Sequence, residues 1–461
     1  MPIPPRTYGA LQVRLRESLV TRAVVLPVQR FIHIQGISSI LLLAAALIAL
    51  VWANSPWHDS YHHVWEMELS LSKLQLPVHA WINDALMAIF FFLVGMEIKH
   101  EIVHGELADM RRAALPVFGA LGGMVVPALL YLAFTHGQPG QHGWGVPMAT
   151  DIAFSLGVLG MVKGVPSDLK VFLLTLAIAD DIGAIIVIAV FYSSSIDRGA
   201  LLVGLIILGL IALMLKLGII RPVAYFVLGV GFWVAILRSG VHATIAGVIL
   251  GFLVPTTAPL SLKEFDEIAA NMASRFREAI ERGDEQGAKN LLGSFDALLN
   301  NTESAAERLT RQLNDWVSFL VLPLFALANA GVTFSAGASA ELLTSRIGWG
   351  IVVGLVIGKP VGIIAFAKVG QMTGLAQLPQ DITWRQLSAV GMLAGIGFTV
   401  SIFISSLAFD DALHLMEAKT AVLGASLVAG VVGYIALRGA GAKPVESPPE
   451  FPAGTVSHVA E

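Results

Sequence analysis

The sequence predicts an all-α integral membrane protein with about twelve transmembrane helices, and its composition supports this fold class. Of the 461 residues, 56% are hydrophobic and only 13% are charged, whereas a soluble domain carries about 25% charged residues. The mean hydropathy is +0.75. Apolar runs recur along nearly the whole chain, which excludes both a water-soluble protein and one with a single membrane anchor.

The cysteine count and the net charge narrow the function classes further. The chain has no cysteine, which excludes disulfides, thiolate metal sites and cysteine nucleophiles. The formal net charge is −4, so no nucleic-acid partner is indicated. The first 30 residues lack a compact basic-then-apolar signal with a cleavage site, so we expect them to be retained as a tail.

Twelve segments are apolar enough to be candidate spans, given that a helix needs about 20 apolar residues to cross a bilayer. The fourth is the weakest, because it is short and contains an aspartate and several glycines. The predicted spans cover residues 36–54, 80–99, 114–134, 146–161, 170–192, 199–217, 223–238, 241–255, 317–336, 347–369, 387–408 and 416–437.

The distribution of lysine and arginine predicts the orientation. If both termini are cytoplasmic, 23 of the 29 basic residues lie in inside segments, five lie in outside segments, and Lys359 lies within a span. The positive-inside rule therefore favours an even number of spans with cytoplasmic ends.

The regions outside the spans divide the chain. We expect a cytoplasmic N-terminal tail over 1–34, a membrane domain over 35–438, and a disordered, cytoplasmic, Pro- and Gly-rich tail over 439–461. Within the membrane domain, 256–316 is polar with charges at helical spacing, which predicts one or two helices on a long cytoplasmic loop. The alternation of leucines over 66–76 predicts a small external β-hairpin.

Charged residues inside predicted spans are the strongest functional signal. Asp151 lies in the fourth span, Asp180 and Asp181 lie in the middle of the fifth, and Lys359 lies mid-way through the tenth. Each such charge costs about 2.5–3.5 kcal/mol at a helix centre, so these residues are candidate functional groups. The second span also carries two acidic residues near its opposite ends, Asp84 and Glu97.

The adjacent Asp180 and Asp181 predict a site at which protons and a cation compete. Two neighbouring carboxylates in a low-dielectric medium cannot both be ionised without a cation, so either protons or a hard cation must neutralise them. In the alternative interpretation, both aspartates pair with Lys359 and only hold the helices together. Lys359 is either a static counter-charge or a group that releases its proton when a cation enters.

The fourth and eleventh spans share a feature that predicts interrupted helices. Residues 151–156 (Asp-Ile-Ala-Phe-Ser-Leu) align with 395–400 (Gly-Ile-Gly-Phe-Thr-Val), and small residues nearby permit a break. Half-helix ends expose unpaired backbone groups at mid-membrane, where Asp151 suits an N-terminus and Lys359 a C-terminus. The alternatives are two ordinary glycine-rich packing faces, and a buried helix cap for Asp151. His242 begins the eighth span, where it is either structural or titrating.

Seven segments carry a resemblance to a known family. They are Trp-Ile-Asn-Asp (81–84), Ala-Thr-Asp-Ile-Ala-Phe (149–154), Ile-Ala-Asp-Asp-Ile-Gly-Ala (178–184), Ser-Gly-Val-His-Ala-Thr-Ile-Ala-Gly (239–247), Phe-Ala-Leu-Ala-Asn-Ala-Gly-Val (325–332), Ile-Gly-Lys-Pro (357–360) and Gly-Ile-Gly-Phe-Thr (395–399). In this order, over about residues 35–438, the chain resembles bacterial NhaA-type sodium/proton antiporters, a family with inverted repeats.

The resemblance implies a transporter rather than an enzyme. It would be electrogenic, with two external protons entering for each cytoplasmic Na⁺ (or Li⁺) that leaves, and it would serve pH and sodium homeostasis without a cofactor. Spans 3–5 and 10–12 would form two inverted repeats, in which spans 4 and 11 are discontinuous and cross. The protein would lie among the lipids of the bacterial inner membrane as a homodimer joined through the hairpin at 66–76.

The resemblance also implies roles for individual residues. Asp180 and Asp181 would bind Na⁺ or Li⁺ and protons, and Lys359 would balance charge or pair with Asp180. Thr150 and Asp151 would lie at the broken helices.

Three further residues would act away from this centre. Glu97 would lie at the cytoplasmic entrance and Asp84 nearer the outside, and His242 would contribute to the pH response. The chain departs from the family pattern in its longer 256–316 loop and at His100, where an arginine is usual. An expected acidic and His-rich cluster before the ninth span is absent, and residues 309–315 read Leu-Thr-Arg-Gln-Leu-Asn-Asp. The pH range of activity therefore stays open.

Other membrane classes fit the sequence less well. An intramembrane aspartyl protease places its two aspartates on separate spans, one of them in Gly-x-Gly-Asp, and no predicted span contains that motif. An ion channel would need a continuous pore and would carry current without counter-transport. A sodium-coupled symporter would need a second site for an organic substrate, for which the sequence offers no residues.

Overall fold

The computed structural model describes residues 26–71, 74–162, 164–193, 196–219, 221–260, 262–333, 344–379 and 382–440. Most of the predicted N-terminal tail (1–34) and almost all of the predicted C-terminal tail (439–461) lie outside these residues, as does the turn of the predicted hairpin at 72–73. The first helix, α2, begins at Leu26, ten residues before the first predicted span.

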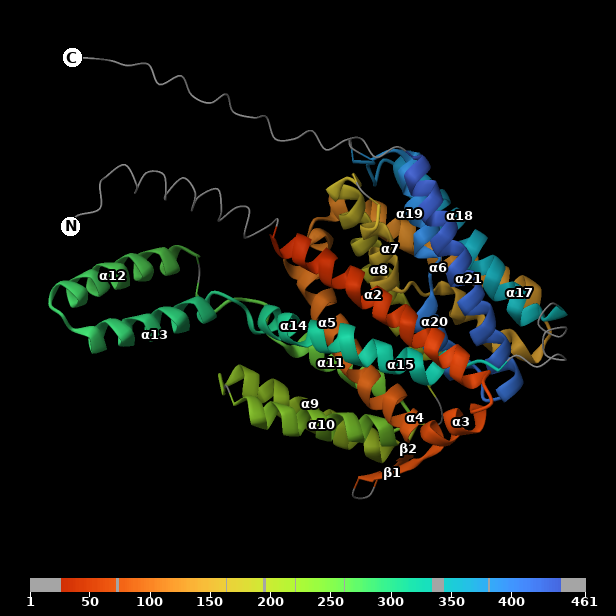
Figure 1. Ribbon diagram of the computed structural model, residues 1–461, viewed down its shortest axis with the longest axis horizontal. Helices are drawn as coiled ribbons and strands as arrows, with labels where there is room; N and C mark the ends of the chain where they lie inside the picture. Colours follow the sequence, from red (N-terminus) through yellow and green to blue (C-terminus); the bar gives the residue numbers. More distant parts are fainter. Residues whose placement is uncertain are drawn as a thin grey trace, which may run out of the picture.

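The protein is mostly helical, with one small sheet (Figure 1). In its first half the elements are α2 (Leu26–Ala53), α3 (His58–Glu66), β1 (Glu68–Leu71), β2 (Leu74–Pro77), α4 (Val78–Ala80), η2 (Trp81–Leu86), α5 (Met87–Val103), η3 (Glu106–Ala108), α6 (Met110–Thr135), η4 (Pro139–Met148), α7 (Ile152–Gly160), α8 (Ser167–Phe191), α9 (Arg198–Lys216) and α10 (Pro222–Arg238).

The second half begins with the helices that follow α10. They are α11 (Ala243–Leu253), α12 (Leu262–Glu281), α13 (Glu285–Asn301), α14 (Ala305–Trp316), η5 (Val317–Val321), α15 (Leu322–Asn329), α17 (Arg346–Val353), η6 (Gly354–Gly358), α18 (Lys359–Met372), α19 (Trp384–Ala394), α20 (Phe398–Ala408) and α21 (Ala412–Gly439). Of the η segments, η2, η5 and η6 are π-helical, and η3 and η4 are 3₁₀-helical.

Seven helical stretches in the described residues are long and apolar enough to cross a bilayer, and α19 with α20 makes an eighth if the bent pair is counted as one span. The seven are Gly36–Ala53, Val78–Val103, Met110–Thr135, Ser167–Phe191, Arg198–Lys216, Arg346–Met372 and Ala412–Gly439. Each coincides with a predicted span, so a multi-pass helical membrane protein is confirmed.

The other four predicted spans are shorter or interrupted. Span 146–161 is α-helical only over Ile152–Gly160, and 223–238 and 241–255 correspond to α10 and α11. Span 317–336 consists of a π-helical segment and α15, which ends at Asn329 rather than at 336. The early end has a local cause, because the Asn329 side chain donates to Phe325 O at 3.1 Å and the chain then leaves the helix.

A close helix pair fixes the position of α18, the helix that begins with Lys359. The backbones of α6 and α18 touch where Gly122 faces Gly362, and a Cβ atom on either glycine would collide with the carbonyl of the other. Small residues allow this approach, which is the usual way that helices associate in a membrane. The pair therefore holds Lys359 at a defined depth beside α8.

The predicted hairpin is present as a two-stranded antiparallel sheet. Strand β1 pairs with β2 from Glu68 opposite Pro77 to Leu71 opposite Leu74. It follows α3, which lies across the end of the bundle where α2 ends (Figure 1).

Tyr61 anchors α3 to the end of α15. Its hydroxyl lies 2.9 Å from Leu327 O and 3.1 Å from Ala328 O, and it accepts from Gly331 N at 3.2 Å. Burial raises the pKa of Tyr61 to about 12, so the hydroxyl keeps its proton at physiological pH. The carbonyls at the end of α15 therefore have a permanent donor.

We expect Tyr61→Phe to lower the stability of the protein by about 1–3 kcal/mol, because it leaves buried backbone groups without a partner. The measurement is the thermal unfolding midpoint in detergent. Tyr434→Phe is the matched control, since the Tyr434 ring packs against the Arg438 guanidinium and the substitution keeps the ring. Equal midpoints for the two variants would contradict this role.

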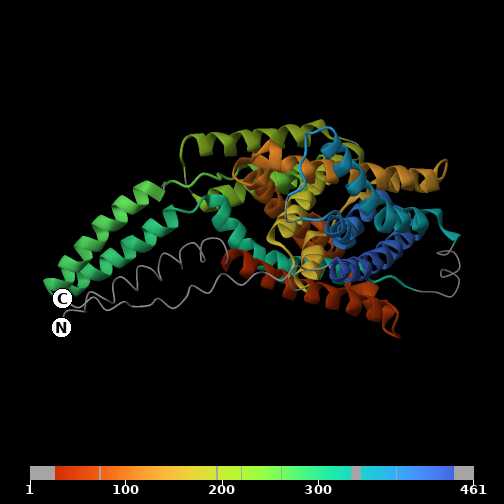
Figure 2. The ribbon, with the colours of Figure 1, turned by 90° about the horizontal axis from the view of Figure 1, so that it is seen from above.

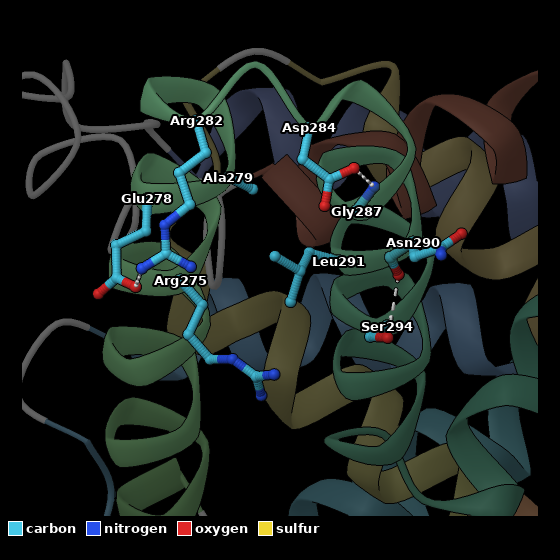
Figure 3. A pocket seen from close by; sticks show the side chains of 9 residues that line it. All are labelled: Arg275, Glu278, Ala279, Arg282, Asp284, Gly287, Asn290, Leu291 and Ser294. Carbon is cyan, nitrogen blue, oxygen red and sulfur yellow. Dashed lines mark hydrogen bonds and ion pairs between the residues drawn. The ribbon is translucent and has the colours of Figure 1, made fainter.

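The polar loop at 256–316 forms three helices, α12, α13 and α14, rather than the one or two that the sequence predicts. Helices α12 and α13 form a hairpin that projects away from the bundle, at the end opposite α3 (Figures 1 and 2). A shallow polar groove lies between them, lined by Arg275, Arg282, Asp284, Asn290 and Ser294 among others (Figure 3). Its residues belong to the hairpin alone, so it is no part of the candidate site below.

Candidate ion-binding site

Helix α8 brings two carboxylates into the interior of the bundle. Asp180 is 1% exposed and Asp181 is 4% exposed. Both lie near the middle of an unbroken 25-residue helix, so the backbone groups around them are satisfied within the helix and cannot solvate the carboxylates. Their surroundings must come from neighbouring segments.

The first neighbouring segment is a break between η4 and α7. The 3₁₀-helical η4 ends at Met148, Ala149 and Asp151 are extended, and α7 begins at Ile152. Asp151 is the N-cap of α7, and its Oδ1 accepts from Phe154 N at 2.9 Å. The predicted span 146–161 is therefore discontinuous.

The second neighbouring segment is the break between α19 and α20, whose axes are bent by 45°. The two breaks contact each other directly. Asp151 N donates to Ile396 O at 2.7 Å, and Asp151 Oδ2 accepts from Thr399 N at 3.0 Å and from Thr399 Oγ1 at 2.6 Å. One carboxylate thus caps the half-helices of both segments, at the positive ends where a negative charge is favourable.

Hydroxyl groups satisfy the carbonyls that the breaks leave unpaired. Thr150 Oγ1 lies 2.9 Å from Ala394 O, and Ser155 Oγ donates to Leu393 O at 3.0 Å, both at the end of α19. In return, Ser401 Oγ on α20 donates to Val146 O in η4 at 2.8 Å. Irregular backbone at membrane depth is tolerated only where such partners exist, so the two breaks stabilise each other.

Asp180 is held by a buried cation and a hydroxyl. Lys359 Nζ, on a side chain that is 0% exposed, lies 2.5 Å from Asp180 Oδ2 and also donates to Met148 O. Thr150 Oγ1 lies 2.7 Å from the same Oδ2. The other oxygen of Asp180, Oδ1, is buried and has no hydrogen-bond partner among the described residues.

Asp181 differs from Asp180, because its carboxylate makes no hydrogen bond or ion pair with the described residues. Three negative side chains act on it electrostatically, namely Asp180, Glu97 and Asp151, and Lys359 opposes them with a positive charge. The site therefore combines two neighbouring carboxylates with unused oxygens and one ammonium group. Carboxylate and neutral oxygens are the ligands that hard cations prefer.

The structure brings together five of the eight residues singled out from the sequence. These five are Thr150, Asp151, Asp180, Asp181 and Lys359. A sixth, Glu97 on α5, acts on Asp181 electrostatically. The remaining two lie elsewhere. Asp84 is in η2, where its backbone oxygen accepts from Trp233 Nε1, and His242 Nε2 lies 2.5 Å from Tyr192 O, just beyond the end of α8.

Sequence reasoning missed several groups of the site. Thr399 is part of a recognised motif but has no predicted contact, and Ser155 and Ser401 are polar residues within apolar runs with no predicted role. The alignment of 151–156 with 395–400 could have paired Ser155 with Thr399. The backbone acceptor Met148 O could not have been found, because it depends on where η4 ends.

Comparison with known proteins decides the family. Residues 29–437 match the family described as Na+/H+ antiporter 1. This chain is an NhaA-type Na⁺/H⁺ antiporter family member. The resemblance carried by the seven sequence motifs is thereby confirmed.

Curated relatives of the NhaA family cover nearly the whole chain. "Na(+)/H(+) antiporter NhaA 2" of Syntrophotalea carbinolica is 42% identical over 425 residues, which is 90% of this chain and 97% of that protein. "Na(+)/H(+) antiporter NhaA" of Koribacter versatilis is 41% identical over 455 residues, 98% of this chain and 99% of that protein. "Na(+)/H(+) antiporter NhaA 2" of Pseudomonas putida is 44% identical over 417 residues, 88% of this chain and 91% of that protein.

Membership of the NhaA family places the chain among transporters rather than enzymes. Together with the apolar helices, it identifies a multi-pass protein of the bacterial inner membrane.

Proposed function

We propose that this protein is an electrogenic antiporter that exchanges cytoplasmic Na⁺ (or Li⁺) for external H⁺ at Asp180 and Asp181. The observation that carries the proposal is the state of the two carboxylates. Asp181 is buried without a hydrogen-bond partner in the described chain, next to an Asp180 whose Oδ1 is likewise unpartnered. Buried charges are costly unless they are paired, so this site needs a cation or protons.

The charges explain why the two substrates compete. One ammonium group, Lys359, cannot neutralise both carboxylates, so one negative charge is left for either Na⁺ or H⁺. Thr150 supports the site, because its hydroxyl oxygen lies beside Asp180 Oδ2. Exchange of two protons for one Na⁺, as the family resemblance implies, would move one net charge per cycle. Na⁺ and H⁺ are then cargo, and the mechanism needs no cofactor.

We propose the architecture that the family resemblance implies, with twelve crossings and two inverted repeats formed by spans 3–5 and 10–12. Support comes from the contacts between equivalent positions of the two breaks. Phe154 and Phe398, which are paired in the alignment of 151–156 with 395–400, stack edge to face with ring centroids 5.8 Å apart. Asp151 also bonds to both half-helices, as a pseudo-twofold crossing would require.

The proposed orientation also assigns a side of the membrane to the remaining parts. With both termini cytoplasmic, the tails at 1–34 and 439–461 and the loop at 256–316 lie inside, joined by the membrane domain at 35–438. Glu97 then lies toward the cytoplasmic entrance. Asp84 and His242 lie nearer the outside, where His242 would contribute to a pH response.

The outer surface suits lipid and a second copy of the chain. Large apolar side chains on α9 and α10 are open, for example Ile206 at 63% and Phe226 at 73% exposed, as expected of lipid-facing helices. The hairpin at 66–76 also exposes Leu69, at 48%. We propose that this hairpin joins two copies in a homodimer, and that the dimer serves pH and sodium homeostasis.

Competition predicts how sodium affinity depends on pH. We expect the apparent Kd for Na⁺ to rise about tenfold per unit fall in pH for each proton that Na⁺ displaces, because linkage makes the two affinities reciprocal. The measurement is calorimetric titration of the purified protein with NaCl from pH 6 to pH 8.5, with choline chloride as the blank.

A sodium affinity that stays constant across this range would refute the shared site. The transport step is tested in proteoliposomes, where a sodium gradient should drive proton movement. Clamping the membrane potential with valinomycin and K⁺ should accelerate this proton movement if the exchange carries net charge.

A further inference from the structure

Four polar side chains from four elements meet at the end of the bundle that carries α3, away from Asp180 and Asp181. They are His79 on α4, Asn83 on η2, Asn329 at the end of α15, and Lys419 on α21. Asn329 Nδ2 donates to Asn83 Oδ1 at 2.8 Å. His79 Nε2 lies 3.2 Å from Asn329 Oδ1 and 3.1 Å from Asn83 Nδ2, and Lys419 Nζ lies 3.4 Å from the same Asn329 Oδ1.

The hydrogen bonds of His79 depend on its protonation. A neutral ring with its proton on Nδ1 can accept from Asn83 Nδ2, and among the described residues Lys419 is then the one donor to Asn329 Oδ1. A protonated ring carries a hydrogen on Nε2, which must point to Asn329 Oδ1 because that oxygen is the acceptor within reach. Two positive groups would then share one amide oxygen, which repulsion disfavours.

Lys419 is poised to respond to such a change. Asn329 is the last residue of α15, so the ammonium lies at the negative end of a helix dipole. No carboxylate of the described chain forms an ion pair with it. Only the hydrogen bond to Asn329 Oδ1 and the helix dipole therefore hold the Lys419 ammonium in place, and no salt bridge opposes its displacement by a protonated His79.

We propose that His79, Asn329 and Lys419 form a proton-operated latch at the external end of the protein. With His79 neutral, Lys419 stays docked on α15 and holds this end closed. When external acid protonates His79, Lys419 leaves Asn329, α21 separates from α15, and the external side of the carrier opens. The latch rests on the proposed function, since it regulates access to the site at Asp180 and Asp181.

Helix α21 connects the latch to the ion site. It packs along α19, and its Ser426 Oγ accepts from Phe398 N, the first residue of α20, at 3.1 Å. The same helix holds α17 through Glu417 Oε2, which accepts from Ser345 Oγ at 2.7 Å. A movement of α21 would therefore reach the break that contacts Asp151.

Other titratable groups on the packed elements do not duplicate His79. Glu417 is occupied by Ser345, and Tyr61 is bonded to the end of α15. No hydrogen bond or ion pair joins His79 or Lys419 to the remaining titratable side chains in the described residues. On the elements around them these side chains include Glu66 on α3, Glu68 on β1, Asp84 on η2, His414 on α21 and Arg346 on α17, besides four exposed ones at 58, 59, 62 and 63 on α3.

The first test measures Na⁺/Na⁺ exchange in right-side-out vesicles with saturating sodium on both sides and the internal pH held constant. Saturation removes competition at the ion site, which would otherwise make the rate rise with pH. We expect the native rate to fall about fivefold as the external pH rises from 5 to 8, a usual size for coupling between sites. His79→Gln should be slow and Lys419→Met fast at every external pH, whereas the exposed His63→Gln should follow the native profile.

A native external-pH profile in both His79→Gln and Lys419→Met would overturn the latch while leaving the antiporter assignment intact.

A second measurement does not depend on transport. Because the chain has no cysteine, spin labels can be placed at Trp57→Cys before α3 and Leu413→Cys on α21, which are 73% and 45% exposed at present. The distance between them should increase as the pH falls from 8 to 5, and His79→Gln should abolish this increase. An unchanged distance would refute the latch even if no exchange were seen.

Discussion

Asp181→Asn is expected to abolish sodium–proton exchange completely. Asparagine keeps the shape of the side chain but can neither ionise nor release a proton. The Asp180–Lys359 ion pair, with its 2.5 Å contact, would then leave the site without a net negative charge. At about 4 Å and an effective dielectric constant of about 20, one such charge contributes about 4 kcal/mol to the binding of a cation. This corresponds to about a thousandfold in affinity.

The measurement is sodium-driven proton movement in proteoliposomes, followed with a pH-sensitive dye and compared with protein-free liposomes. Asp168→Asn is the matched control, because Asp168 lies in the first turn of the same helix and is exposed. The control should transport like the native protein. Full exchange by Asp181→Asn would show that the Asp181 carboxylate, which Lys359 does not neutralise, is not the group that binds the transported cation.

The sequence predicted the parts of the site whose signal is a charge in an apolar run. Asp151, Asp180, Asp181 and Lys359 are conspicuous because each is costly in a membrane. The alignment of 151–156 with 395–400 also predicted the two breaks. The pairing itself was not predictable, because Lys359 and Asp180 are 179 residues apart and their contact depends on how α18 packs against α6, which in turn packs against α8.

The polar contacts at the end of the bundle that carries α3 could not be predicted from the sequence. Lys419 is one of the five basic residues that the sequence predicts on the outside, and the structure places its ammonium group against Asn329. Asn83 and Asn329 belong to two of the seven segments that carry the family resemblance, but nothing in those segments indicates that the two side chains meet. The end of α15 at Asn329 was also missed, because it depends on a hydrogen bond from Asn329 and an anchor from Tyr61 on a distant segment.

Removal of the Lys359 ammonium is expected to destabilise the protein strongly. In Lys359→Met the apolar stem is retained, but Asp180 becomes a buried carboxylate that has lost its cation and keeps only Thr150 as a partner. Breaking a buried ion pair from one side costs about 3–5 kcal/mol, because the remaining charge is uncompensated. Met148 O also loses its donor.

The double variant Asp180→Asn/Lys359→Met separates this charge effect from a simple packing defect. Removing both charges takes away the uncompensated carboxylate, so most of the lost stability should return. The measurement is the unfolding midpoint in detergent at pH 8 for the native protein, both single variants and the double variant. The deficit of Lys359→Met should shrink at acidic pH, because protonation of Asp180 removes the same charge.

Transport by the same variants addresses the second interpretation of Lys359, as a group that exchanges its own proton. If the ammonium only balances charge, the double variant should still bind Na⁺ at Asp181, with an affinity that depends on pH through one proton. If Lys359 carries a transported proton, Lys359→Met, which keeps both carboxylates, should move one charge fewer per cycle than the native protein, whereas a static counter-charge predicts no change. The stability measurement has its own contradicting outcome, namely a double variant that is no more stable than Lys359→Met. Lys359 would then stabilise the protein through its hydrogen bond to Met148 O at the end of η4, and not through the ion pair with Asp180.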